Sequence, residues 1–262
     1  SMEDLSSAKE WITGNASAEH VPRIVGFDLP NEFIRLGDVT PLVILPGNHD
    51  RFSGKKNSPG SPNFETVFGV NWDLGRGSTT LTSFHGIREF NLKKDGEHLS
   101  ILSADLTLKA ESDADRRWGY LGQGYAYDDV CQGLVQATAK CVETNPNVYV
   151  IWATHFPPDF EHKKVGSCLK LLNSGKLVKA ATDAGVNLIF CGHTHIRDVY
   201  KVAGVNVICA GTAIAFGKQE AHSFNAITLE TQGGKLTKAA VIDFLWDEND
   251  AAFNRNNKIH LS

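Results

Sequence analysis

Four histidines in three short motifs are the residues of this chain whose types and spacing could do chemistry. Imidazole nitrogens bind divalent cations, and they also give and take protons near neutral pH. Each motif comes where a strand is expected to end, which is how open α/β sheets present ligands at their carboxyl edge. A metal site is therefore the hypothesis to test. The four are His49 in Gly47-Asn48-His49-Asp50, His155 in Thr154-His155-Phe156-Pro157-Pro158, and His193 and His195 in Cys191-Gly192-His193-Thr194-His195.

The elements that must position these motifs are three apolar runs of strand length. They are Leu42–Leu45, Val148–Ala153 and Val186–Cys191. Helical spacing of apolar residues fills the intervals at Asp128–Val142 and Leu171–Ala184. Alternating strands and helices favour a largely parallel sheet, in which neighbouring strands end side by side. The histidines can then converge although they lie more than a hundred residues apart.

The rest of the chain predicts one domain, spanning 1–262, with its motif-bearing part at 41–245. The pattern after residue 195 consists of strand-like segments with short turns, which indicates an antiparallel tail. No repeat or linker divides the chain. Residues 1–40 carry helical spacing at 3–12, and 33–38 fits either a strand or the end of a helix. The remaining expected elements are a short helix at 63–68, apolar alternation at 99–108, and strands at 199–202, 205–210, 225–229 and 238–244.

The spacing of the candidate ligands suggests two metal ions. His193 and His195 are two residues apart, so each could serve one of two ions roughly 3.5 to 4 Å apart, as in two-metal hydrolytic sites. Asn48 offers an amide oxygen, and Mn, Fe, Zn or Mg ions accept mixed oxygen and imidazole ligands. Asp50 could fix the orientation of an imidazole, and His49 could donate a proton beside the metals. Taken singly, the motifs around Asn48 and His193 could each be an ordinary turn.

Composition excludes several classes of partner. The net charge is −4 and the pI about 6.2, with no basic run, so neither a nucleic-acid duplex nor an anionic membrane is an expected partner. The apolar runs are far shorter than the roughly 20 residues of a membrane span. Five cysteines without a CxxC pair suggest no disulfide framework, and a cytoplasmic setting is expected. Cys191 and Cys209 are expected to be buried apolar residues.

The three motifs together resemble those of the calcineurin-like metallophosphoesterase superfamily, and they stand in the family's order. The matching segments are Pro46-Gly47-Asn48-His49-Asp50, Trp152-Ala153-Thr154-His155-Phe156-Pro157-Pro158 and Cys191-Gly192-His193-Thr194-His195. The resemblance implies a four-layer α/β/β/α sandwich with mixed sheets, and hydrolysis of a small-molecule phosphomonoester or phosphodiester by metal-activated water. It also implies ligand roles: Asn48, His155 and His193 on one metal, His195 on the other, and His49 as the proton donor to the leaving oxygen.

The sequence also departs from the family's pattern. Members have an Asp-x-His strand end followed by a Gly-Asp turn whose Asp bridges the metals, and no Asp-x-His occurs here. Gly37-Asp38 lies only ten residues before Asn48, too close for a parallel crossover, so Asp38 is not expected to be the bridging ligand. We expect an N-terminal portion or a segment before Pro41 to be missing, and the alternative is a divergent member with a depleted first metal site. Two functions other than hydrolysis stay open: a degenerate member that binds a phosphorylated ligand or a partner without hydrolysis, and a structural domain that is independent of metal.

Overall fold

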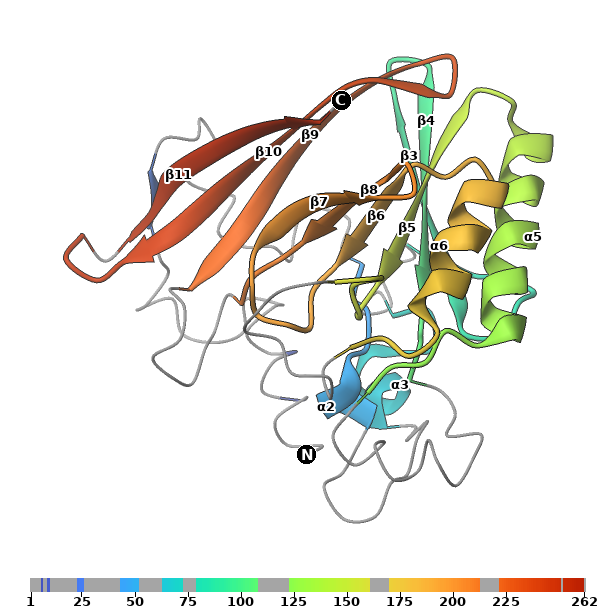
Figure 1. Ribbon diagram of the computed structural model, residues 1–262, viewed down its shortest axis with the longest axis horizontal. Helices are drawn as coiled ribbons and strands as arrows, with labels where there is room; N and C mark the ends of the chain where they lie inside the picture. Colours follow the sequence, from blue (N-terminus) through green and yellow to red (C-terminus); the bar gives the residue numbers. More distant parts are fainter. Residues whose placement is uncertain are drawn as a thin grey trace.

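The structure, a computed structural model, describes ten parts of the chain. They form two β-sheets packed face to face, with helices against the other face of the larger sheet (Figure 1). The side chains of 23–25, His49 and Arg51 are not described, and the segment predicted at 33–38 lies outside the described residues. The described parts are Ser6, Lys9, 23–25, 43–51, 63–72, 79–107, 123–160, 170–212, 222–250 and 252–261.

The larger sheet has seven strands in the order β2-β3-β4-β5-β6-β8-β7. Strands β4, β5, β6 and β8 are parallel to their neighbours among themselves, while β2, β3 and β7 pair antiparallel. The parallel strands are rich in Val, Ile and Leu because both of their faces are covered. The bounds are β2 Thr79–Leu81, β3 Ile87–Lys94, β4 Glu97–Ala104, β5 Val148–Thr154, β6 Leu188–Cys191, β7 Asp198–Val202 and β8 Val205–Cys209.

Two helices cover one face of this sheet, α5 (Asp128–Thr144) and α6 (Ser174–Asp183). Both lie where the sequence predicts helices. Leu134 of α5 and Leu177 of α6 are fully buried with Trp152 of β5. Burying such side chains stabilises the fold by roughly 1.5 to 3 kcal/mol each.

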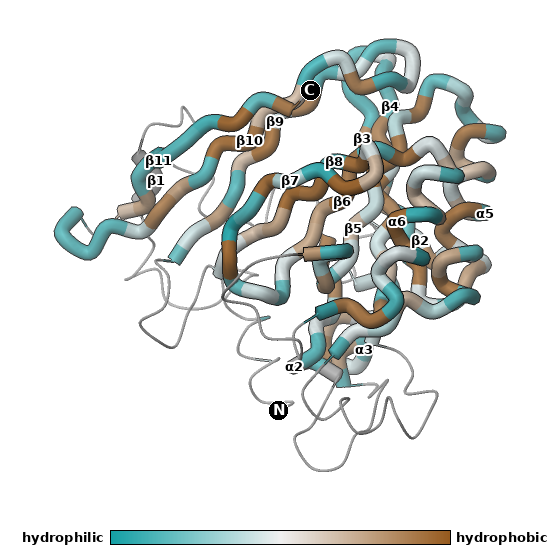
Figure 2. The backbone as a smooth tube through the Cα atoms, in the orientation of Figure 1, coloured by the Kyte–Doolittle hydropathy of each residue, from teal (hydrophilic) through white to brown (hydrophobic). Residues whose placement is uncertain are grey.

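The smaller sheet, in the order β1-β11-β10-β9, packs on the opposite face of the large sheet. Val241 of β10 is buried against Ile151 of β5 and Leu188 of β6. In the colouring of Figure 2, hydrophobic residues gather along β6 and β8, whereas the turn between β10 and β11 is hydrophilic. The bounds are β1 Arg23–Val25, β9 Ser223–Gln232, β10 Lys235–Asp247 and β11 Ala252–Leu261.

The expected α/β class with mixed sheets is confirmed, and the described residues supply a helix layer and two sheet layers. The predicted strands at 148–153, 186–191, 199–202, 205–210, 225–229 and 238–244 are present within a few residues. The antiparallel tail is divided between the sheets, because β7 and β8 extend the large one and β8 pairs parallel with β6. No described helix is both long and apolar enough to cross a membrane.

The prediction of a buried strand at Leu42–Leu45 is wrong for the described part, residues 43–45, which belongs to no strand. Ile44 donates its N–H to the carbonyl oxygen of Trp72 at 3.0 Å. Ile44 and Leu45 pack on a small aromatic cluster that includes Phe64. Ile44 and Leu45 are therefore apolar because they pack against the helix α3 (Asn63–Phe68), and they do not lie in the sheet. Helix α3 is the predicted short helix.

Candidate metal centre

Asn48, His155 and His193 come together at the carboxyl edge of the large sheet. Asn48 begins the four-residue helix α2 (Asn48–Arg51), His155 directly follows β5, and His193 lies two residues after the end of β6. The Nε2 atom of His155 lies 2.9 Å from Oδ1 of Asn48 and 3.2 Å from Nδ1 of His193. Asn48 is 5% exposed and both histidines are half-buried. The convergence expected from parallel strand ends is thus present for these three residues.

The spacing of these three atoms suits a shared cation. Nitrogen and oxygen ligands lie about 2.0 to 2.2 Å from Zn²⁺, so neighbouring ligands in right-angled or tetrahedral geometry lie about 2.8 to 3.6 Å apart. The two contacts of His155 Nε2 fall in this range. A single N–H at His155 Nε2 cannot point at both Asn48 Oδ1 and His193 Nδ1, whereas a cation between them accepts a lone pair from each of the three atoms. The donor set therefore fits a divalent ion.

Gly47 makes the close approach of His155 to Asn48 possible. A Cβ on Gly47 would lie 2.6 Å from Cε1 of His155 and 2.9 Å from each ring nitrogen. Any side chain here would push the imidazole away. On another side the ring meets the fully buried Phe156, whose centroid lies 5.0 Å from that of His155 and 4.4 Å from that of His193. Packing thus holds both imidazoles in place.

The loop after β6 is held in an unusual backbone conformation. His193 has φ of 69° and His195 has φ of 59°, both in the left-handed region that non-glycine residues seldom adopt. The N–H of Gly192 donates to the carbonyl of His155 at 3.0 Å, and that of Thr194 donates to the carbonyl of Gly192 at 2.8 Å. Strained backbone of this kind is concentrated at functional sites.

His195 is not brought to the cluster that Asn48, His155 and His193 form. The residue is exposed, and no hydrogen bond or ring contact among the described residues joins it to that cluster. A place for a second ion at His195 therefore stays a prediction. The side chain of His49 and the whole of Asp38 lie outside the described residues.

Asp50 closes the turn that carries Asn48. Its Oδ2 accepts the N–H of Gly47 at 2.7 Å, and its own N–H donates to the carbonyl of Gly47 at 3.2 Å. This is half of a capping box, in which an acidic residue in the first helical turn binds the backbone before the helix. Asp50 therefore holds the ligand-bearing backbone, and its expected hydrogen bond to an imidazole stays a prediction.

Asp105 is a further polar residue at this edge, and it lies outside the three histidine motifs. Ala104 at the end of β4 pairs with Thr154 at the end of β5, so the next residues, Asp105 and His155, are neighbours. Asp105 is fully buried, and its Oδ1 accepts the N–H of Thr107 at 2.8 Å. The signal available in the sequence was an acidic residue interrupting the apolar alternation of 99–108.

Two buried thiols lie behind the histidine loop, as expected for apolar fillers. Cys191 pairs in register with Cys209 of the neighbouring strand, and Cys209 is fully buried. Burial raises the pKa of the Cys191 thiol well above its usual value. Cys209 Sγ lies 3.5 Å from the hydroxyl of Thr194. The thiols therefore support the loop.

The described residues contain no group of three His, Cys, Asp or Glu side chains arranged for a metal. In the cluster of Asn48, His155 and His193, the third candidate ligand is the side-chain amide of Asn48.

Comparison with known proteins gives one family match. The profile of the calcineurin-like phosphoesterase family matches residues 14–197, which include all three histidine motifs. No curated protein matches the sequence.

Similar solved structures are distant from this chain. A Vps29 double mutant from Entamoeba histolytica is 12% identical, with 48% of this chain and 77% of that chain covered and a TM-score of 0.26. GAP50 of Plasmodium is 12% identical, with 69% and 50% covered and a TM-score of 0.33. A putative 5′-nucleotidase from Staphylococcus aureus is 11% identical, with 70% and 30% covered and a TM-score of 0.31. The chain thus spans half or less of the last two, and none of these likenesses bears on what it does.

Proposed function

We propose, since this chain belongs to the calcineurin-like phosphoesterase family, that it is a metal-dependent hydrolase of phosphomonoesters or phosphodiesters. The observation that carries the proposal is the convergence of three donor atoms. His155 Nε2 lies within hydrogen-bonding distance of both Asn48 Oδ1 and His193 Nδ1. An amide oxygen and two imidazole nitrogens form a neutral donor set. Such a set leaves the positive charge of a divalent cation available to a phosphate.

The roles of the residues follow from their places. Asn48, His155 and His193 would hold one cation, and His195 would serve a second one nearby. When bound, such ions would polarise the phosphoryl group and lower the pKa of a water molecule. Gly47 and Phe156 keep the imidazole of His155 in position. Asp50 fixes the turn that carries Asn48 and His49 in the chain.

His49 is the proposed proton donor. It neighbours Asn48 in α2, so its backbone lies beside the cluster. An imidazole with a pKa near neutrality can give a proton to a leaving alkoxide, and general acids contribute typically 10²- to 10⁴-fold to a rate. A small-molecule ester is the proposed substrate, and Mn, Fe, Zn and Mg remain candidate metals.

A second candidate function is ligand binding without hydrolysis. The observation that favours it is the lack of any Asp-x-His in the 262 residues, together with the exposed position of His195 apart from the cluster. A centre with one ion in place of two would lose the second charge beside the attacking and leaving oxygens. The number of bound ions therefore separates the two candidates.

The test is a pair of measurements on the purified protein. Hydrolysis of p-nitrophenyl phosphate and bis-p-nitrophenyl phosphate is followed with and without added Mn²⁺, and bound metal is counted after equilibrium dialysis. Hydrolysis requires turnover that depends on Mn²⁺ and about two ions per chain. His155→Ala should abolish both binding and turnover, and His49→Ala should lower turnover at least a hundredfold with metal retained.

The matched control is His260→Ala. His260 is an exposed histidine in β11 of the smaller sheet, so its removal alters histidine content without touching the cluster. Full rate in His49→Ala would remove the assigned acid. One ion or none per chain, with no turnover towards either ester, would favour the binding protein and refute the hydrolase.

A further inference from the structure

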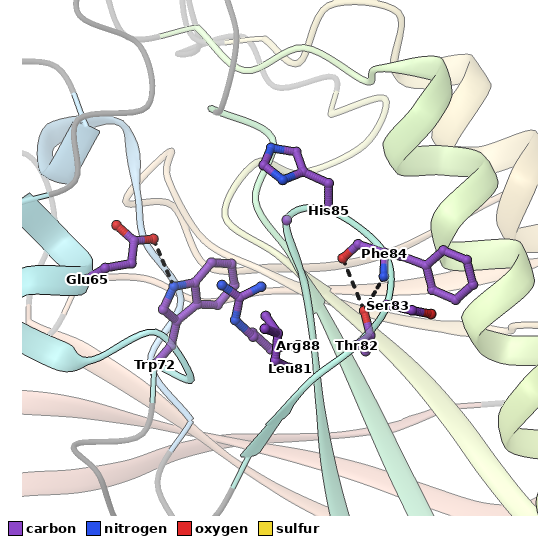
Figure 3. Close-up of a pocket in the computed structure, with 9 residues that line it drawn as sticks. Glu65, Trp72, Leu81, Thr82, Ser83, Phe84, His85 and Arg88 are labelled. Carbon is purple, nitrogen blue, oxygen red and sulfur yellow. Dashed lines mark hydrogen bonds between the residues drawn. The ribbon is translucent and has the colours of Figure 1, made fainter.

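A cavity of about 350 Å³ lies beside the proposed centre, between α3 and the connection from β2 to β3 (Figure 3). This volume falls in the range of small-molecule sites, roughly 300 to 1,000 Å³. Figure 3 shows Glu65 and Trp72 on one side and Thr82 to Phe84 on the other. The lining residues that matter here are Glu65, Trp72, Leu81, Ser83, His85 and Arg88.

The cavity opens at the same edge of the sheet as the histidine cluster. Ile87, which begins β3 next to the cavity, pairs with Ala104, and Ala104 pairs with Thr154. Two strand spacings, or about 10 Å, therefore separate Ile87 from the residue before His155. The carbonyl of Trp72 also binds the N–H of Ile44, four residues before Asn48. A single extended molecule could thus reach both places.

One wall of the cavity is built around a strained tryptophan. Trp72 is 1% exposed and has φ of 58°, a left-handed conformation that is an outlier for a bulky residue. Its Nε1 donates to Oε1 of Glu65 at 3.1 Å, and the guanidinium carbon of Arg88 lies 4.3 Å from its ring centroid. Arg88 Nε donates to the carbonyl of Val70 at 2.6 Å. These contacts within the protein hold Trp72 and Arg88 in place in this wall.

The opposite wall is a turn fixed by its own hydrogen bonds. The hydroxyl of Thr82 accepts the N–H of Phe84 at 3.1 Å and lies 3.0 Å from the carbonyl of Ile87, to which it donates. The ring of Phe84 points away from Trp72 and towards α5 in Figure 3. Ser83 and His85 are exposed in this turn. The turn therefore offers a hydroxyl and an imidazole to a ligand, and not the ring of Phe84.

The lining also exposes apolar surface. Leu81, in the edge strand β2, lines the cavity and is 58% exposed, whereas the indole of Trp72 in the same lining is 1% exposed. A carboxylate and a guanidinium both belong to the lining, so their formal charges sum to zero. The exposed side chain of Leu81 and the exposed imidazole of His85 favour a flat ring, and the hydroxyl of Ser83 favours a ring with donors and acceptors. The balanced charge of the lining disfavours a second phosphate.

We infer that this cavity binds the organic part of the phosphoester and that this part carries a flat, uncharged heteroaromatic ring with the chemistry of a nucleobase. The assignment of the ring to an ester rests on the proposed function. The binding of the free ring does not, because it needs no metal and no hydrolysis.

The binding test uses adenosine as the probe and the metal-free protein, followed by isothermal titration calorimetry. Leu81→Trp places a bulky side chain in the cavity from an exposed position in a strand, where tryptophan is well tolerated. We expect it to weaken adenosine binding at least tenfold. Leu92→Trp is the matched control, because Leu92 is an exposed leucine of the adjacent strand β3, 38% exposed, that does not line the cavity.

The activity test compares 5′-AMP with glycerol 3-phosphate in the Mn²⁺-loaded protein. Leu81→Trp should lower kcat/KM for 5′-AMP about tenfold and leave that for glycerol 3-phosphate unchanged. Wild-type protein that binds no adenosine, or equal binding by the wild type and Leu81→Trp, would overturn the inference. Adenosine binding that Leu81→Trp removes, in a protein that hydrolyses neither ester, would support the ring site while refuting the hydrolase.

Discussion

The imidazole of His155 lies against the backbone of Gly47 so closely that a Cβ on Gly47 would stand 2.6 Å from its Cε1. Gly47, which precedes the proposed ligand Asn48, is thus in tight contact with a second proposed ligand, His155. The position of the donor atoms therefore depends on the absence of a side chain at residue 47.

Gly47→Ala is expected to displace His155 and to lower affinity for Mn²⁺ at least tenfold, as for other residues that orient metal-bound histidines. The added methyl group would overlap a ring that also packs on Phe156, so the ring is expected to shift out of the cluster. Gly192→Ala is the control, because a Cβ there meets nothing within 4 Å. Calorimetric titration with Mn²⁺ measures both, and equal affinities would show that His155 is not a ligand.

Metal binding should also appear in the thermal stability of the protein. An ion that binds only the folded state at a hundred times its Kd adds about 2.7 kcal/mol, which for a chain of this size corresponds to roughly 5 to 10 °C in Tm. Asn48→Leu and His193→Phe should remove this increase. His260→Phe should keep it, because His260 is exposed in β11. Identical Tm values with metal and with chelator in the wild type would contradict the proposed centre.

The sequence predicted the parts of the fold that repeat a regular pattern. Val148–Ala153 and Asp128–Val142 were identifiable because a buried parallel strand is continuously apolar and a surface helix is amphipathic. The hairpin of β3 and β4 was missed although Asp95-Gly96, with φ of 53° and 83°, is a typical two-residue hairpin turn. Polar residues along β3 obscured the alternation that marks a strand.

The candidate site was predictable in its ligands and less so in their placement. Asn48, His155 and His193 stood out because each follows an apolar run, although the run before Asn48 packs under α3 and forms no strand. Trp72 and His85 could not be assigned to one cavity from the sequence. Their proximity depends on β2 and β3, which pair antiparallel at the edge of the sheet.

The ion pair between Arg197 and Asp243 is expected to fasten the loop after His195 to the smaller sheet. Arg197 Nη1 lies 2.5 Å from Asp243 Oδ2, and the two side chains are 28% and 13% exposed. Asp243→Ala leaves the guanidinium without this partner in a mostly buried place, which should cost about 2 to 3 kcal/mol, less than the 3 to 5 of a fully buried pair. Urea unfolding measures the loss.

The control for this pair is Glu230→Ala. It removes the exposed pair of Lys238 with Glu230, at 2.7 Å with exposures of 59% and 53%, and should cost less than about 1 kcal/mol. Equal losses in the two variants would show that the Arg197 pair contributes no more than a surface pair does.

The buried thiols of α5 should make the protein less stable at alkaline pH. Burial raises the pKa of Cys131 and of Cys141 from 9.0 to about 11 each. A thiol whose pKa is higher in the folded state stabilises the fold below pH 9, and this stabilisation is lost as the pH rises from 9 towards 11. Urea unfolding at pH 8 and pH 10.5 should show the decline.

Cys131→Ala should reduce the decline by on the order of 1 kcal/mol, since alanine has no proton to lose and is a good helix former. The buried hydroxyl of Tyr149, whose pKa is also raised by burial, contributes equally to the wild type and the variant, so the difference between them isolates the thiol. A decline of the same size in both proteins would mean that Cys131 ionises as readily in the folded chain as in the unfolded one.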